Sequence, residues 1–230
     1  LDIDPKTLDT MREYFAEFGL GTKTGIDIPS ESVGYLPQSE QLVNILDLSY
    51  GQFDLYTPLQ LVQYASVIAN GGVRYAPRLV KEIRNTDANG HLGGVETTIE
   101  PKVMNVVPVE KAVMDRIHEG MYQVSHTMDG TAHYLFMDYP IKVGSKTGTA
   151  EAFYAGPIQY AANNPVVNAT YIGYAPYDKP EIAVSVVLPY LPADATGRDS
   201  TRIARDVMNA YFETREATRS TIESYKPNQP

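Results

Sequence analysis

The five residues Ser145-Lys146-Thr147-Gly148-Thr149 combine the chemical groups that could hold an anionic peptide. Lys146 carries a positive charge, and the three hydroxyl groups can donate hydrogen bonds to a carboxylate. Glycine stands on both sides of Lys146, at positions 144 and 148. Because glycine inside a strand often marks the close approach of another backbone or a ligand, the segment predicts a binding site for an extended peptide that ends in a carboxylate.

This segment must lie on a strand, and the sequence predicts one from Ile141 to Ala150. Alternation places Ser145, Thr147 and Thr149 on one face of the strand and Lys146 with its glycines on the other. An open strand edge can pair with the main chain of a bound peptide. The alternative is a polar edge strand whose lysine only discourages aggregation.

The rest of the chain predicts an α+β fold in which helices pack on an antiparallel sheet. Two further strands are expected at Val166–Ala175 and Glu181–Leu188. Since three strands are near the lower limit for an independently stable sheet, we expect the complete sheet to be larger. The remaining expected elements are helices over residues 5–18, 58–69, 108–126 and 198–211, strands at Arg78–Ile83 and Pro101–Val107, and an ambiguous apolar segment at Leu42–Leu48.

Composition excludes several classes of function. The net charge is −9, which disfavours nucleic acid as a partner because phosphate contacts need clustered cations. Cysteine is absent, so thiolate metal sites and a cysteine nucleophile are excluded. The four histidines, His91, His118, His126 and His133, lack metal-site spacing and are expected to be ordinary histidines, so no metal or cofactor is predicted. No apolar run reaches the roughly 18–20 residues of a membrane span, and no signal peptide opens the chain.

Several sequence blocks resemble the class B penicillin-binding proteins, which are D,D-transpeptidases. They occur in the order of that family over about residues 20 to 210, which makes the set far more specific than any one motif. The blocks are Thr24-Gly25-Ile26-Asp27-Ile28-Pro29, Tyr50-Gly51-Gln52 followed by Thr57-Pro58-Leu59, Ala69-Asn70-Gly71-Gly72, Asp129-Gly130-Thr131-Ala132, Lys146-Thr147-Gly148-Thr149-Ala150-Glu151 and Tyr171-Ile172-Gly173-Tyr174-Ala175-Pro176.

The resemblance implies the C-terminal part of the β-lactamase/transpeptidase-like fold, occupying residues 1–213, with a polar tail at 214–230 that should fray. It implies acyl transfer from the D-Ala-D-Ala end of peptidoglycan stem peptides, and binding of β-lactams, at the extracytoplasmic face of the cell membrane. Lys146 and Thr149 take catalytic roles in this assignment, the backbone N–H of Thr149 being an oxyanion-hole donor. The residues Ser145, Lys146, Thr147, Gly148 and Thr149 form the substrate-binding strand.

Two motifs of the family are not found. Neither S-x-x-K, which carries the nucleophilic serine, nor S-x-N occurs in the sequence. In the family both precede the helix at Pro5, so we expect a truncated chain that begins after the S-x-N segment and is inactive alone. Its partner would be the N-terminal part of the same protein or a second copy of the chain.

Several alternatives remain open from the sequence. The chain could be a non-catalytic module that binds peptides or β-lactams, or a β-lactamase or β-lactam sensor of the same superfamily. Glu40 and Asn44 have the E-x-x-x-N spacing of a deacylating pair, in which the carboxylate would activate water, although a solvated loop fits their surroundings better. The stretch Ala152–Asn168, with Tyr154 and Tyr160, is either a loop over the site or an ordinary hairpin loop.

Overall fold

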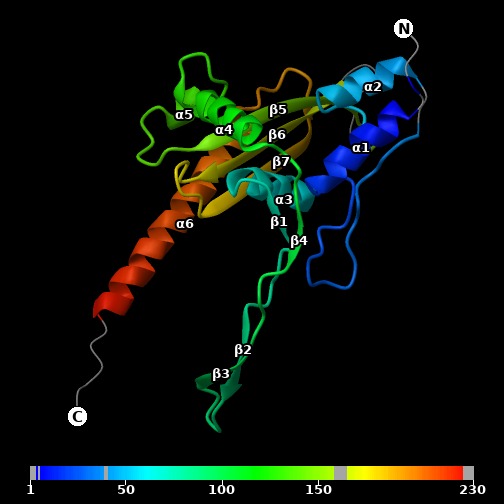
Figure 1. The fold of residues 1–230 in the computed structure, drawn as a ribbon. Coiled ribbons are helices and arrows are strands. Elements are labelled where there is room, and N and C mark those ends of the chain that lie inside the picture. The colour runs from blue at the N-terminus through cyan, green and yellow to red at the C-terminus, as the bar shows by residue number, and fades with distance from the viewer. Residues whose placement is uncertain (1–3, 5, 39–40, 158–164, 225–230) are drawn as a thin grey trace. The chain divides into compact units, whose positions relative to one another are not determined.

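The structure is a computed structural model that describes residue 4 and residues 6–38, 41–157 and 165–224. The chain divides into two compact units, Leu1–Ile117 and His118–Pro230, which are described separately. Figure 1 shows the elements of both units. Helix α4 (Lys111–His126) contains the boundary between them.

Three helices make up much of the first unit: α1 (Thr7–Glu17), α2 (Leu42–Ser49) and α3 (Pro58–Ala69). The apolar segment Leu42–Leu48, which the sequence left ambiguous, is helical. Its residues Ile45 and Leu48 pack against Leu8 of α1. Helix α3 begins with the expected cap. Thr57 Oγ1 accepts a hydrogen bond from the Gln60 N–H, and Gln60 Oε1 accepts one from the Thr57 N–H. This reciprocal pair satisfies two donors that a helix start would otherwise leave unpaired.

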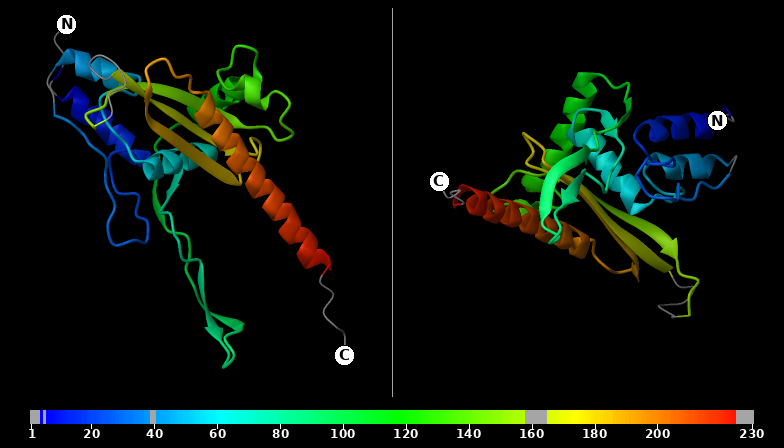
Figure 2. Two further views of the ribbon diagram at one scale, coloured as in Figure 1. Left: turned by 180° about the vertical axis from the view of Figure 1, so that it is seen from behind. Right: turned by 90° about the horizontal axis from the view of Figure 1, so that it is seen from below.

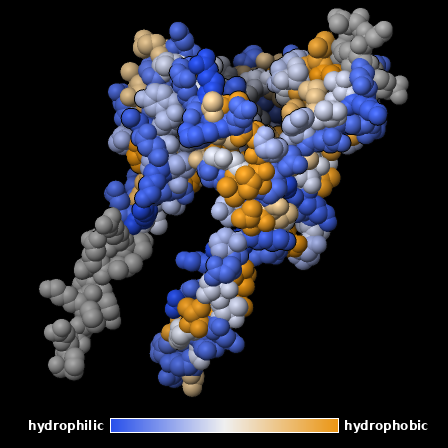
Figure 3. All heavy atoms as spheres, viewed as in Figure 1, coloured by the Kyte–Doolittle hydropathy of each residue, from blue (hydrophilic) through white to orange (hydrophobic). Residues whose placement is uncertain are grey.

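A two-stranded ribbon also belongs to the first unit. Its strands pair as β1 (Val73–Tyr75) with β4 (Val103–Val106) and β2 (Glu82–Thr86) with β3 (Leu92–Thr98). The strands predicted at 78–83 and 101–107 begin later in the structure, at Glu82 and Val103. Pro77 and Pro101 lie between the β1–β4 pair and the β2–β3 pair, and proline cannot donate a ladder hydrogen bond. The ribbon exposes Leu92 and other apolar side chains. Orange patches on the ribbon in Figure 3 show that apolar residues reach its surface.

The second unit contains an antiparallel sheet in the order β5-β6-β7. The predicted strands and closing helix are confirmed as β5 (Gly144–Phe153), β6 (Pro165–Ala175), β7 (Ile182–Pro192) and α6 (Arg198–Ser224), preceded by the short helix α5 (His133–Phe136). Lys146 of β5 lies opposite Ile172 of β6 in the register. The α+β fold class predicted from the sequence is therefore confirmed.

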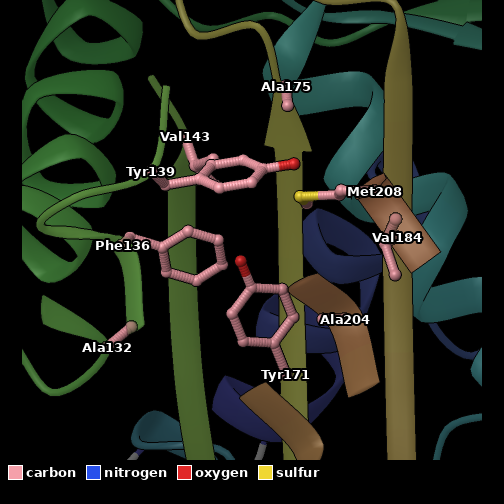
Figure 4. Close-up of a cluster of buried hydrophobic side chains, with 9 residues drawn as sticks. All are labelled: Ala132, Phe136, Tyr139, Val143, Tyr171, Ala175, Val184, Ala204 and Met208. Atoms are coloured by element: carbon pink, nitrogen blue, oxygen red, sulfur yellow. The ribbon is translucent and has the colours of Figure 1, made fainter. Parts of the chain in front are cut away.

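One hydrophobic core joins α6 to this sheet. Ala204 and Met208 of α6 pack with Tyr171 of β6 and Val184 of β7. Figure 4 shows the rings of Phe136, Tyr139 and Tyr171 beside the Met208 side chain. Full burial of one such large apolar side chain contributes roughly 1.5–3 kcal/mol, so this cluster fixes the sheet against its helix.

The closing helix was expected to end at residue 211, but α6 continues to Ser224. No glycine or proline occurs from Arg198 until Pro227, so nothing in the sequence ends the helix at residue 211. The division into a domain at 1–213 and a polar tail stays a prediction. Arg215 also pairs with Glu181, which precedes β7. Figures 1 and 2 show α6 running past the end of the sheet.

Candidate active site

The predicted site residues lie on β5, which is the edge strand of its sheet. β5 pairs with β6 along its whole length, and within the described residues its opposite edge has no strand partner. Lys146 and Thr149 are exposed, and Thr147 is half-buried. An edge strand with a cation and two accessible hydroxyls can pair with a peptide backbone and bind an anion at the same time.

Ser145 differs from its neighbours because it is fully buried. Its Oγ atom lies 2.7 Å from Oγ of Ser125, a buried residue in the last turn of α4. Buried hydroxyls are costly without a partner, and each of these two serines satisfies the other. Ser145 therefore fastens β5 to α4, and its direct binding of substrate stays a prediction.

Thr147 is held through both its side chain and its main chain. Its Oγ1 atom lies 2.7 Å from Oγ1 of Thr131. Its carbonyl oxygen accepts a hydrogen bond of 2.5 Å from Nζ of Lys146. The lysine ammonium group is therefore held against the main chain of Thr147.

His126 supports the start of the same strand. Its Nε2 atom accepts a hydrogen bond of 3.0 Å from the Val143 N–H, two residues before Ser145. Burial lowers the pKa of His126, and the nearby Lys142 and His133 act in the same direction. The ring thus remains neutral, which it must be in order to accept this hydrogen bond.

The glycines beside Lys146 have a structural explanation. A Cβ atom on Gly144 would lie 2.5 Å from the ring of Tyr174, and one on Gly148 would lie 2.3 Å from Oγ1 of Thr170. Both neighbours belong to β6. The close approach that the sequence suggested is therefore made by side chains of the adjacent strand, which replaces the expected approach of a ligand or another backbone.

Two further candidate features, Glu40 and the stretch 152–168, lie wholly or partly outside the described residues, and Tyr160 is among those not described. Tyr154 of that stretch packs edge-to-face against Tyr190, with ring centroids 5.2 Å apart. Within the part of the chain that the structure describes, no cluster of acidic or histidine side chains could hold a metal ion, and no helix is long and apolar enough to cross a bilayer.

Sequence reasoning did not find Ser125, His126 and Thr131, which contact β5 from the α4–α5 segment. Thr131 belongs to the Asp129-Gly130-Thr131-Ala132 block, so the order of motifs pointed to its neighbourhood. Ser125 and His126 gave no such signal. They close a helix whose apolar pattern says nothing of the two polar residues at its end.

Known proteins give a consistent picture. The family described as the penicillin binding protein transpeptidase domain matches residues 6–209. Penicillin-binding protein 2A of Bacillus subtilis is 43% identical over 215 residues, which cover 93% of this chain and 30% of that protein. Peptidoglycan D,D-transpeptidase MrdA of Haemophilus influenzae is 26% identical over 226 residues, covering 90% of this chain and 33% of that protein.

A solved structure supports the fold independently. Penicillin-binding protein 2B of Streptococcus pneumoniae strain R6 superposes with a TM-score of 0.83 at 37% identity, covering 93% of this chain and 34% of that one. The chain thus spans about a third or less of the relatives that it matches. Because the family match covers most of the residues and the strand Lys146–Thr149 lies within it, this chain belongs to the penicillin-binding protein transpeptidase family.

Proposed function

We propose that this chain forms the carboxylate-binding side of the active site in a peptidoglycan D,D-transpeptidase, a serine enzyme that cross-links stem peptides. The observation that carries the proposal is the open edge of β5, a strand on which Lys146 and Thr149 are exposed and Thr147 is half-buried. A stem peptide would add to this edge as an extended strand. Its terminal D-Ala carboxylate would bind Lys146 and the two threonine hydroxyls.

The reaction is an acyl transfer. The serine of an S-x-x-K motif, supplied by a segment outside this sequence, attacks the carbonyl of the penultimate D-Ala and expels the terminal D-Ala. The amine of a second stem peptide then attacks the acyl-enzyme, forming the cross-link and releasing the serine. β-Lactams acylate the same serine and form a stable adduct.

The residues of this chain assist that reaction by charge and position. The Thr149 N–H would donate to the developing oxyanion, and Lys146 would polarise the serine of the S-x-N motif. Removing one oxyanion donor costs about 3–4 kcal/mol in other serine enzymes. The hydroxyl of Ser145 is buried, and its hydrogen bond to Ser125 would hold β5 against α4.

The longer protein would act at the extracytoplasmic face of the cell membrane, held there by an N-terminal anchor. Its substrate, peptidoglycan, lies on that side of the membrane. The remaining part of the transpeptidase domain would be the direct partner of this chain, because it supplies the nucleophile. No cofactor enters the proposed reaction.

Substitution of Lys146 in the full-length protein tests the proposal. Lys146→Ala should slow acylation by a labelled penicillin by roughly a hundredfold or more, the scale for a lost electrostatic stabiliser, while leaving the melting temperature close to that of the wild type. Lys142→Ala is the matched control, since it removes the same charge four residues earlier, where the ammonium lies near the ring of Tyr122.

Three outcomes are informative. Slow acylation in Lys146→Ala alone supports the proposal, and equal rates in the wild type and in Lys146→Ala contradict the site assignment. Rapid turnover of a chromogenic β-lactam by the wild-type protein, without a stable adduct, contradicts the transpeptidase and indicates a β-lactamase.

A further inference from the structure

Thr131 is an exposed threonine whose hydroxyl touches the proposed site. Its Oγ1 atom lies 2.7 Å from Oγ1 of Thr147, sixteen positions further along the chain. Thr131 itself belongs neither to β5 nor to a helix, since it lies in the turn between α4 and α5. The contact therefore joins a turn to the strand that would bind substrate.

The turn that carries Thr131 is tightly folded on the end of α4. The Gly130 N–H donates to the Thr127 carbonyl at 2.9 Å, and the Ala132 N–H donates to the Val124 carbonyl at 3.0 Å. A Cβ atom on Gly130 would lie 2.3 Å from that same Val124 oxygen, so only glycine allows the turn to come this close to α4. The backbone on both sides of Thr131 is thus fixed.

Packing fixes the turn from its other side as well. Ala132 is fully buried in the core cluster that contains Phe136 and Tyr171. Tyr171 lies directly opposite Thr147 in the sheet register. The core that contains Ala132 of the turn therefore also contains the residue of β6 next to Thr147. The position of the Thr131 hydroxyl beside Thr147 is therefore fixed by the packing of the turn and the strand.

The direction of the hydroxyl contact decides what Thr147 can do. A threonine hydroxyl has one donor and two acceptor sites. If Thr147 donates to Thr131, only lone pairs remain to face a substrate carboxylate, which they repel. If Thr131 donates to Thr147, the Thr147 O–H is released to donate to the carboxylate, and the two bonds strengthen each other.

We propose that Thr131 is a positioning residue that donates to Thr147 and thereby directs the Thr147 hydroxyl toward the carboxylate of a stem peptide or β-lactam. This inference rests on the proposed transpeptidase function and adds a residue to its carboxylate-binding group. Thr131 itself does not contact the ligand. It acts by keeping the Thr147 proton available, while Lys146 holds the Thr147 carbonyl.

Three variants of the full-length protein test this proposal. Thr131→Val keeps the shape of the side chain but lacks the hydroxyl, and acylation by benzylpenicillin should slow about threefold to tenfold, the scale of one hydrogen bond. Thr131→Ser keeps the hydroxyl and should acylate at the wild-type rate. Thr127→Val is the matched control, since its hydroxyl donates to the Gln123 carbonyl in the same turn without touching β5.

The substrate carboxylate offers a readout that a purely structural role would not move. The methyl ester of benzylpenicillin has no anion at this position and keeps only a neutral carbonyl acceptor, so Thr131→Val should slow acylation by the ester clearly less than acylation by the free acid. In addition, Thr131→Val should have no further effect in a Thr147→Val background, because the acceptor of the contact is already gone.

The outcomes separate this inference from the function on which it rests. If Lys146→Ala slows acylation but Thr131→Val and Thr131→Ser both match the wild type, the role of Thr131 is refuted and the site assignment stands. An equal loss in Thr131→Val with the ester and the free acid also refutes it. If Lys146→Ala itself has no effect, the proposed function fails first.

Discussion

Ser125 and Ser145 place their hydroxyl oxygens 2.7 Å apart in the interior of the second unit, where both residues are fully buried. This contact ties the last turn of α4 to the strand that carries Lys146. Replacing either serine alone by alanine leaves the other hydroxyl without its partner. We expect each single variant to lower the free energy of unfolding by about 1–3 kcal/mol, measured by chemical denaturation of the chain.

The double variant Ser125→Ala/Ser145→Ala should be less destabilised than the sum of the single variants, since it leaves no unpaired hydroxyl. Additive losses would contradict a direct contact. If Ser145→Ala in the full-length protein slows acylation while unfolding is unchanged, Ser145 binds substrate directly, as the sequence first suggested.

His126 should make the stability of the chain depend on pH. Its pKa in the folded protein is lowered by burial, so the unfolded state binds more protons near and below the ordinary histidine pKa of about 6.5. The stabilisation is therefore complete above that pH and declines as the pH falls through it toward the lowered folded value. The melting temperature of the wild type, followed from pH 7.5 to 5, should decrease on the acid side.

The variants of His126 isolate this contribution. The side-chain amide introduced by His126→Gln can still accept from the Val143 N–H but does not titrate, so the melting temperature of this variant should change less between pH 7.5 and 5 than that of the wild type. His126→Leu should be less stable at all pH values because it lacks the acceptor. Parallel pH profiles for the wild type and His126→Gln would show that His126 does not cause the dependence.

The chain of 230 residues should form no covalent adduct with a labelled penicillin. No serine in it is followed by lysine at the third position, the spacing that the family uses to activate its nucleophile. Intact-mass spectrometry after incubation measures this directly, and the full-length protein is the positive control. A stoichiometric mass increase on the isolated chain would mean that a serine of this sequence is the nucleophile.

The outer edge of β7 should be covered in the complete protein. Within the described residues β7 pairs with β6 alone, whereas α6 contributes Ala204 and Met208 to the core that also contains Tyr171 of β6 and Val184 of β7. The segment from Ile182 to Leu188 is apolar and uncharged, and unpaired edges of this kind recruit other strands. We expect a strand from the N-terminal part of the protein or a second copy to occupy it, and aggregation of the isolated chain without either.

Light scattering after size-exclusion chromatography, combined with hydrogen exchange, measures this occupancy. A soluble monomer whose β7 amides exchange slowly on both edges would contradict the prediction.

The sequence by itself determined the order and type of most elements. Thr57 and Gln60 form a capping box that local chemistry alone dictates, and the alternation from Val143 to Thr149 specifies a strand with two distinct faces. The ordered motifs also identified the family, because each motif is a short local pattern. These features are readable since they depend on residues a few positions apart.

Tertiary structure alone decided which face of that strand is covered and by what. Alternation placed Ser145 with Thr147, but it could not show that Ser125 would bury one hydroxyl while Thr131 would meet the other. Nor could it show that the glycines beside Lys146 make room for Tyr174 and Thr170. Each contact joins residues 16 to 30 positions apart, and such pairs are set by how α4 and β6 pack on β5, which no local pattern encodes.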